Sequence, residues 1–209
     1  MLRRMQIVNA RSSVVILCLL SVSVAGYAVA AYGFLPLGSL VHPEMSVVFR
    51  ANMPGIYAHV FGAAVALALG PFQFSARLRT TRPSLHRWLG RVYLGVGILV
   101  GGVSGLYLAF YSYGGAIAHG GFALLALLWL YSGLRAYFSI RARDVAAHRR
   151  WMVRNFALSF AAVTLRIYLP SAMAAGIAFE FAYPIISWLC WVPNLIAAEL
   201  LVNRKLRTP

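Results

Sequence analysis

The sequence predicts an all-α, polytopic membrane protein with six transmembrane helices, and composition and pattern both support this. The chain of 209 residues is 61% hydrophobic and only 11% charged, whereas a soluble domain is about half apolar and about a quarter charged. Its apolar residues fall in unbroken runs of the length that crosses a bilayer, about 20 residues. Its basic residues gather between these runs. We therefore expect a single integral membrane domain over residues 1–209.

The net charge of +15 does not indicate binding to nucleic acid. The basic side chains lie in short loops rather than on one soluble face, which is a signal of membrane topology. Anionic lipid head groups account for much of this surplus, so membrane lipid is an expected partner. Cys18 and Cys190 lie inside apolar runs without metal-ligand spacing, and we expect them to be buried apolar residues.

Local signals place the ends of several helices. Asn52 and Pro54 are typical of a helix start, as a cap and a first-turn proline. Asp144 is the expected cap of the fifth helix, and Pro170 is expected to end that helix. The first apolar run resembles a signal peptide, but we interpret it as a retained helix. The six expected helices span residues 12–35, 55–74, 85–111, 117–139, 145–169 and 183–201.

Helices 2–5 are expected to form a four-helix core, with the first and sixth helices peripheral. Gly97, Gly101 and Gly105 in the third helix have the spacing of a close packing seam. Six spans put both termini on one side of the membrane. Most of the 19 Lys and Arg residues fall on that side, so the positive-inside rule predicts cytoplasmic termini. We expect a multi-pass protein of the bacterial cytoplasmic (inner) membrane.

Four of the five histidines form two pairs according to depth. His59 and His119 lie near the outer ends of the second and fourth helices, and His86 and His148 lie near the cytoplasmic starts of the third and fifth. Facing imidazoles on bundle helices are what axial ligation of heme iron requires. We therefore predict two b-type hemes, although a histidine near a helix end often only caps or hydrogen-bonds. His42 has no such partner and is expected to be an ordinary loop residue.

One stripe of the fifth helix carries polar residues. His148, Asn155, Ser159 and Arg166 return to one face at about 100° per residue. Arg166 lies about 27 Å above His148, near the depth of the outer pair. Because a charge inside the membrane normally faces a partner or a cavity, Arg166 is a candidate contact for an outer heme propionate or an anionic substrate. The alternative is a pair with Glu180 or a side chain that snorkels to the surface.

Basic residues beside the inner pair are candidate contacts for the propionates of an inner heme, and Asn155 lies on the same stripe. Anchoring of the helices at the cytoplasmic face is an equally good role for each arginine taken singly. The candidates are Arg87, Arg91, Arg149, Arg150 and Arg154.

Short motifs surround the four histidines and Arg166. They are Tyr57-Ala58-His59, His86-Arg87-Trp88-Leu89-Gly90-Arg91-Val92-Tyr93, Ala118-His119, His148-Arg149-Arg150-Trp151-Met152-Val153-Arg154-Asn155-Phe156 and Arg166-Ile167-Tyr168-Leu169-Pro170. With these motifs, residues 57–170 resemble a bacterial membrane family known as domain of unknown function 2306. The family name implies a membrane location and no activity.

The helix order and the placement of the histidines also resemble the cytochrome b561 type of six-helix, two-heme membrane protein. This resemblance implies that the second helix pairs with the fourth and the third with the fifth, here His59 with His119 and His86 with His148. It implies a membrane oxidoreductase, but the substrate-binding residues of the b561 type have no match in this sequence.

Together these patterns predict a transmembrane electron-transfer protein that passes electrons between an inner and an outer heme. A lipid-soluble quinone or a small redox donor or acceptor is the expected partner. An alternative is a non-catalytic accessory or assembly subunit of a larger membrane complex. A third hypothesis is a transporter of metal or small molecules. The two separated histidine pairs and the lack of an acidic residue at a helix centre speak against that hypothesis.

Overall fold

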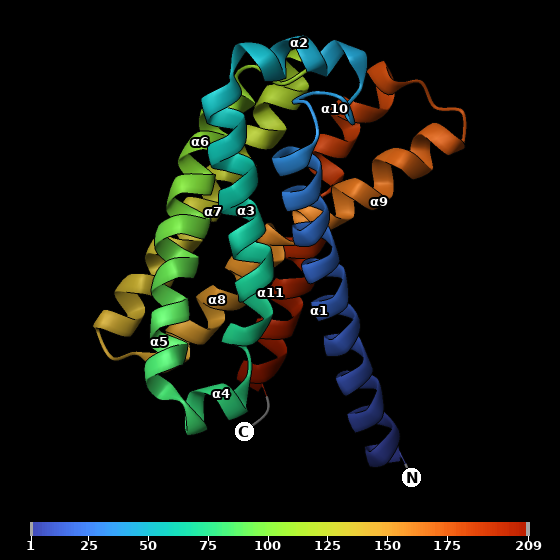
Figure 1. Ribbon diagram of the computed structural model, residues 1–209. Helices are drawn as coiled ribbons and strands as arrows, with labels where there is room; N and C mark the ends of the chain where they lie inside the picture. Colours follow the sequence, from blue (N-terminus) through green and yellow to red (C-terminus); the bar gives the residue numbers. More distant parts are fainter. Residues whose placement is uncertain (1, 208–209) are drawn as a thin grey trace.

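The computed structural model describes residues 2–207, with the side chains of residues 14–203, and this part of the chain is helical without strands. Six helical stretches within it are long and apolar enough to cross a membrane, which confirms the predicted fold class. These spans are Val14–Phe34, Met53–Gln73, Pro83–Ala109, Gly115–Arg141, Val145–Ala174 and Phe179–Asn203. The N-terminal end of the first span and the C-terminal end of the last lie at the same end of the bundle (Figure 1).

Three of the spans are built from consecutive helical segments. The third contains a π-helix, η1, between two α-helices, and the fifth and sixth are broken once each. In chain order the elements are α1 (Leu2–Phe34), α2 (Pro43–Ala51), α3 (Met53–Gln73), α4 (Ala76–Thr81), α5 (Pro83–Val92), η1 (Tyr93–Val100), α6 (Gly101–Ala109), α7 (Gly115–Arg141), α8 (Val145–Ser159), α9 (Ala161–Ala174), α10 (Phe179–Leu189) and α11 (Val192–Arg207).

Two details of the helix ends differ from the sequence prediction. Pro170 does not end the fifth span, because α9 continues to Ala174 and the Ser171 hydroxyl donates to the Ile167 carbonyl one turn back. Pro170 removes only the N–H that would bond the Arg166 carbonyl, and membrane helices tolerate such a loss. The side chain of Asn52 does not cap α3; instead its Oδ1 accepts a 2.7 Å hydrogen bond from the hydroxyl of Tyr107 in α6. The predicted cap at Asp144 is present, with Oδ1 accepting from the Ala147 amide at 2.8 Å.

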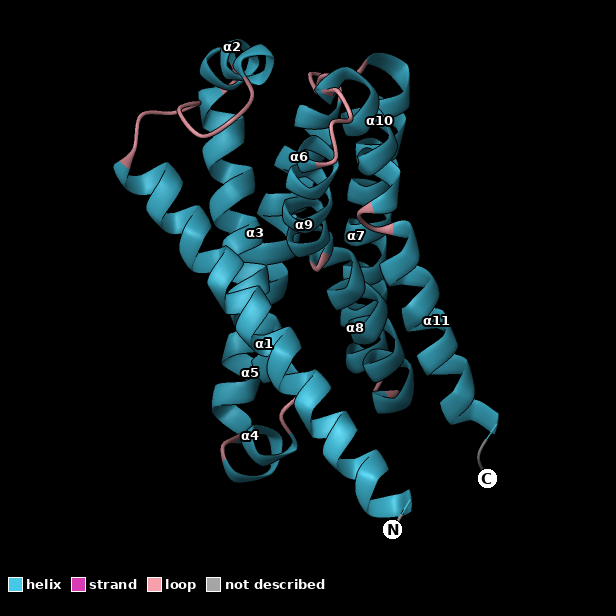
Figure 2. Cartoon of the chain, turned by 90° about the vertical axis from the view of Figure 1, so that its right-hand side faces the viewer, coloured by secondary structure: helices cyan, strands magenta, loops and turns pink. Residues whose placement is uncertain are grey.

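The second to fifth spans close into a ring. The α3 helix packs against η1 and α6, these pack against α7, α7 packs against α8, and α8 returns to α3. It follows that α3 lies diagonally across the ring from α7, and α5 with η1 lies diagonally across from α8. The first span packs mainly on α3, and α10 and α11 pack on α7, α8 and α9, so both are peripheral as predicted (Figure 2).

Glycines bring the second and third spans into close contact. A Cβ atom on Gly97 would lie 3.0 Å from the Cβ of Ala66, and one on Gly62 would lie 2.8 Å from the backbone of Gly101. Small residues at such an interface let two membrane helices pack closely without a hydrophobic driving force. The glycine seam of the third helix therefore packs against α3.

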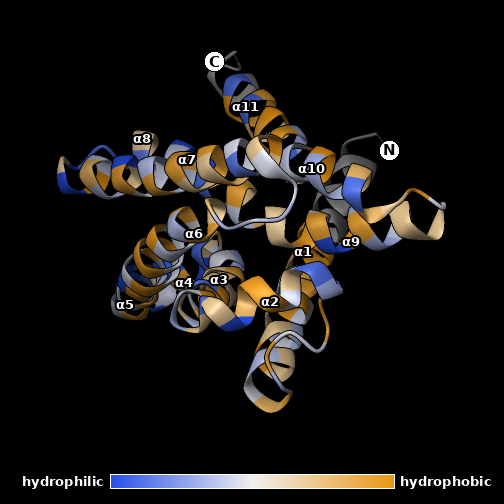
Figure 3. Ribbon diagram, turned by 90° about the horizontal axis from the view of Figure 1, so that it is seen from above, coloured by the Kyte–Doolittle hydropathy of each residue, from blue (hydrophilic) through white to orange (hydrophobic). Residues whose placement is uncertain are grey.

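The outside of the bundle is apolar at the level of the spans. Val103, Leu127 and Ile185 are each at least half exposed, and hydrophobic residues recur along the helices (Figure 3). So much exposed apolar surface is what a protein surrounded by lipid requires. The chain is therefore a multi-pass membrane protein with lipid-facing helices.

We predict that Gly62→Ala loosens the contact between α3 and α6. The new methyl group would lie 2.8 Å from the Gly101 Cα and nitrogen, and overpacking of this kind costs about 1–3 kcal/mol. Thermal unfolding in detergent should show a lower Tm than the wild type. Gly26→Ala in α1 is the matched control, since a Cβ there meets no atom within 4 Å; an equal loss in both variants would contradict the prediction.

Candidate functional site

The cavity that we call the inner cavity lies in the half of the ring nearer to the two ends of the chain and has a volume of about 540 Å³. Its walls come from α5, η1, α7 and α8. His86 and His148 both line it, and they approach from helices that lie diagonally across the ring. The structure thus brings the predicted inner pair of histidines to one cavity.

The two inner histidines are held differently. The Nδ1 atom of His148 lies 2.9 Å from the Ala136 carbonyl oxygen of α7. Because a carbonyl only accepts, this nitrogen carries the proton, and the Nε2 lone pair is left for another partner. A backbone anchor of this kind is how proteins orient metal-ligating histidines. The Nδ1 of His86 is buried and has no hydrogen-bond partner in the protein.

A single hydrogen bond sets the two inner histidines at the same depth. Tyr93 follows His86 by seven residues, or two helical turns, and Asn155 follows His148 by the same interval. The Tyr93 hydroxyl donates to Asn155 Oδ1 at 2.7 Å, and both residues are fully buried. Since this bond fixes the register of α5 and η1 against α8, the two histidines, each two turns below it, lie at one depth.

Basic side chains surround the mouth of this cavity. Arg87 and Arg91, two of the predicted contacts, line it together with Arg141, and all three are exposed. Sequence reasoning missed Arg141, which ends α7 and looks like an ordinary basic anchor. The cavity therefore combines apolar walls, two imidazoles and a positive mouth.

The other predicted inner contacts lie elsewhere. Arg154 makes a bidentate ion pair with Glu199 of α11, with N–O distances of 2.6 and 2.8 Å. Arg150 is half-buried and lines neither cavity, and Asn155 lies in the core between the cavities. The polar stripe of the fifth span does face the inside of the bundle. The sequence alone could not tell which of its residues line a cavity and which bond to a neighbouring helix.

The outer cavity is larger, about 770 Å³, and reaches from the core to α1, α2 and α10. The α9 helix leaves the direction of α8 and runs toward the periphery, which widens this half of the bundle (Figures 1 and 3). His59 and Arg166 both line the cavity, as predicted from their depth. The Nδ1 atom of His59 lies 2.8 Å from the Gly101 carbonyl, so His59 is oriented like His148, with Nε2 left free.

Arg166 is an intramembrane arginine with no carboxylate partner among the described side chains. Its guanidinium donates to the Ala162 carbonyl at 3.0 Å and lies 5.5 Å from the centre of the Tyr27 ring. Glu180 is exposed and does not pair with it. The cation is thus held by a carbonyl and an aromatic face, at a cavity wall where an anionic group would find it.

The structure does not bring His119 into the outer cavity with His59. His119 lies in the first turns of α7, diagonally across the ring, and its Nε2 is 2.9 Å from the Ser112 carbonyl oxygen. Ser112 itself lines the cavity, so His119 is at the rim. Its role as an axial ligand stays a prediction: with Nε2 on this carbonyl, Nδ1 is the nitrogen left to bind a metal, but His119 does not line the cavity.

His42 was expected to be an ordinary loop residue, but it lines the outer cavity. Its ring stacks on Phe179 with centroids 3.9 Å apart and planes 3° apart, and its Nδ1 is buried without a partner. No local pattern could show this contact, because Phe179 begins α10, far along the chain.

These geometries define what the site can do. Three of the four core histidines line a cavity within a membrane bundle, and two of them share one. No cluster of three or more His, Cys, Asp or Glu side chains that could hold a metal ion occurs in the described part of the chain. A bis-imidazole arrangement suits a planar cofactor whose iron takes one ligand from each side.

Comparison with known families gives a single assignment. Residues 56–202 match the model of the family described as "Predicted membrane protein (DUF2306)", and the chain belongs to that family. No curated protein and no solved structure matches the chain.

We predict that Gly105→Ala acts through His59. A Cβ on Gly105 would lie 2.7 Å from His59 Nδ1, so the ring would have to leave the Gly101 carbonyl, at a cost of about 1–3 kcal/mol. Thermal unfolding should therefore show a clear loss in the wild-type background and little in a His59→Ala background. Gly95→Ala, which meets nothing within 4 Å, is the control. Equal losses in both backgrounds would show that Gly105 contacts something else.

Proposed function

We propose that this member of the DUF2306 family is a transmembrane electron-transfer protein that carries heme b. The observation that supports the proposal is the inner cavity, where His86 and His148 approach from diagonal helices. Bound heme would supply one-electron redox chemistry, and the protein would supply ligation, burial and propionate contacts. A cavity of about 540 Å³ is within the usual range for small-molecule and cofactor sites.

The residues of the inner site fit the parts of a heme. His148 presents Nε2 while its Nδ1 is anchored to the Ala136 carbonyl, and His86 has a buried ring nitrogen without a partner. Arg87, Arg91 and Arg141 at the mouth match the negative propionates, which arginine binds with two donors at once. The apolar walls of η1 and α7 would keep water from the iron.

The outer level fits a second heme less completely. His59 is oriented for ligation, and Arg166 lies at the same cavity for a propionate. The second axial position falls to His119 only if its ring moves from the rim into the cavity. We keep the two-heme arrangement as the proposal, with a lipid-soluble quinone or a small redox molecule as the partner.

The alternatives make other predictions. A transporter needs a continuous path, whereas the inner and outer cavities are separate and share no lining residue. An accessory subunit of a larger complex would keep its assembly and the activity of its partners when His59 and His148 are replaced by alanine. Electron transfer through heme would be lost in the same variants.

The heme content tests the proposal directly. Protein purified from heme-replete cells should show a reducible b-type spectrum with two hemes per chain by pyridine hemochrome. His86→Ala and His148→Ala should each remove the inner heme and leave one heme per chain. His59→Ala should remove the outer heme and also leave one. Asn194→Ala, which changes a residue that lines neither cavity, is the control, with two hemes expected. A colourless protein that is folded and monodisperse would contradict the proposal.

The proposed orientation places both termini in the cytoplasm of a bacterial cell. In a variant without Cys18 and Cys190, a cysteine at exposed Ser39 should react with a membrane-impermeant maleimide on intact cells. A cysteine at exposed Ala142, in the turn between α7 and α8, should react only after the cells are opened. The reverse labelling pattern would invert the topology.

A further inference from the structure

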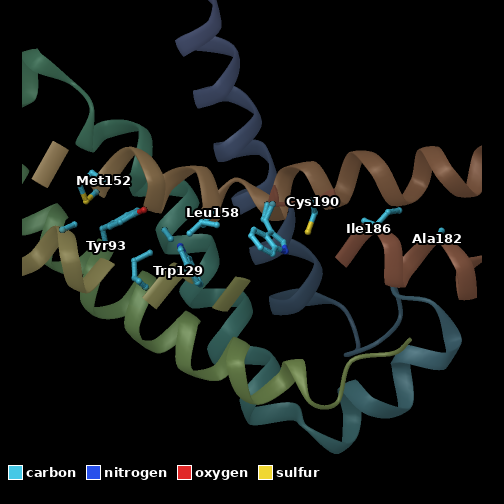
Figure 4. Close-up of a cluster of buried hydrophobic side chains, with 12 residues drawn as sticks. Tyr93, Trp129, Met152, Leu158, Ala182, Ile186 and Cys190 are labelled. Carbon is cyan, nitrogen blue, oxygen red and sulfur yellow. The ribbon is translucent and has the colours of Figure 1, made fainter. Parts of the chain in front are cut away.

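A thin wall separates the two cavities. Along α7 the two linings are adjacent, because Trp129 lines the outer cavity and Leu130 lines the inner one. Along α8 the outer cavity ends at Leu158 and the inner cavity begins at Met152, which are six residues apart, or about 9 Å. Figure 4 shows Met152, Tyr93, Trp129 and Leu158 close together in this region.

Three buried polar residues fill the wall and line neither cavity: Tyr93, Ser132 and Asn155 are each at most 3% exposed. The Asn155 amide donates to the Trp129 carbonyl at 2.8 Å and to the Ser132 hydroxyl at 2.9 Å. Its Oδ1 accepts from Tyr93. Ser159, at the outer side, accepts from the Trp129 indole at 2.8 Å. We name the five residues that make these contacts the septum: Tyr93, Trp129, Ser132, Asn155 and Ser159.

The hydrogen bonds of the septum are complete within the protein. None of its side-chain polar atoms is among the buried atoms without a partner. Asn155 uses both amide hydrogens and its oxygen, so no donor is left to hold a water molecule. A buried polar network that is fully satisfied is rigid, whereas one with a free group readily admits water.

The chemistry of the central residue matters as much as its packing. A proton can pass along hydroxyl groups and waters, because each can accept a proton on one side and release one on the other. A side-chain amide donates through nitrogen and accepts through a different atom, and it does not titrate. Asn155 therefore interrupts any proton path between the cavities, whose outer walls include exposed residues such as Tyr111 and Arg91.

We propose that the septum centred on Asn155 is a proton barrier that separates the outer and inner cavities. A protein with an open cavity at each face of a membrane otherwise dissipates the proton gradient through its own core. The barrier deepens the proposed electron-transfer function and rests on it for its purpose, because electrons can tunnel through about 9 Å of packed side chains and protons cannot.

Proton flux into liposomes tests the barrier. Reconstituted protein with pyranine inside the vesicles is exposed to a potassium gradient with valinomycin, and the rate of internal acidification is measured. Asn155→Asp keeps the shape of the side chain and adds a group that titrates. We expect it to raise the flux about tenfold, which corresponds to a barrier lowered by about 1.4 kcal/mol. Asn155→Leu leaves Tyr93 and Ser132 without their amide partner but adds no group that titrates, so its flux should stay below that of Asn155→Asp.

Asn194 provides the matched control. Its amide also donates to a hydroxyl and a carbonyl, those of Thr164 and Cys190, but it lies in α11 outside the ring. Asn194→Asp should leave the flux at the wild-type level. Should Asn155→Asp not fold, Tyr93→Phe removes one hydroxyl and leaves Asn155 Oδ1 without its donor, and we expect an intermediate flux.

Two results would overturn the barrier. One is a wild-type flux well above that of empty liposomes. The other is a folded Asn155→Asp or Tyr93→Phe variant that is no leakier than Asn194→Asp. The assay needs no heme, so a colourless protein with the expected fluxes would refute the electron-transfer proposal and leave the barrier intact, and a two-heme protein with a leaky wild type would do the opposite.

Discussion

The side chain of Asn155 is the contact on which the arrangement of the core depends. Lipid tails offer no hydrophobic driving force between membrane helices, so their relative positions rest on close packing and on buried hydrogen bonds. This amide joins the third, fourth and fifth spans through Tyr93, Trp129 and Ser132. Because it does so from a fully buried position, a shift of any of these spans by one turn would leave several polar groups unpaired.

The positions of the inner histidines follow from this contact. His86 and His148 each lie two turns below a partner in the Tyr93–Asn155 bond, so the register that satisfies the bond also sets the two histidines at one depth. A second bond, from His148 to the Ala136 carbonyl, then orients one ring. The outer level has no such cross-link between His59 and His119, and there the histidines do not share a cavity.

Much of the fold could be predicted from the sequence, because a bilayer imposes one length and one polarity on every span. The depth of His59 and Arg166 followed from helix geometry alone. The π-helix that starts at Tyr93 and the pairing of Arg154 with Glu199 did not. Both depend on which helix neighbours which, and a single sequence carries no record of contacts between distant segments. The short helix α2 was missed because its nine residues are too few for a clear periodic pattern.

The site also combines features that the sequence predicts with contacts that it does not. The depths of His86 and His148 in their helices identified the inner pair, and the structure places both at one cavity. It could not show that His42 stacks on Phe179, or that the Nε2 atom of His119 is held by a backbone carbonyl in a neighbouring turn. Such details are set by side-chain rotations at helix ends, where several partners compete for one imidazole.

The thinness of the septum also determines where the membrane voltage acts. With water in both cavities, the electric field is concentrated across a layer of about 9 Å rather than across the full hydrocarbon core of about 30 Å. An elementary charge that crosses this layer then experiences nearly all of the potential, about 2.3 kcal/mol for each 100 mV. Charge movement between the two cavities would therefore be electrogenic, and its equilibrium would respond to the energised state of the cell.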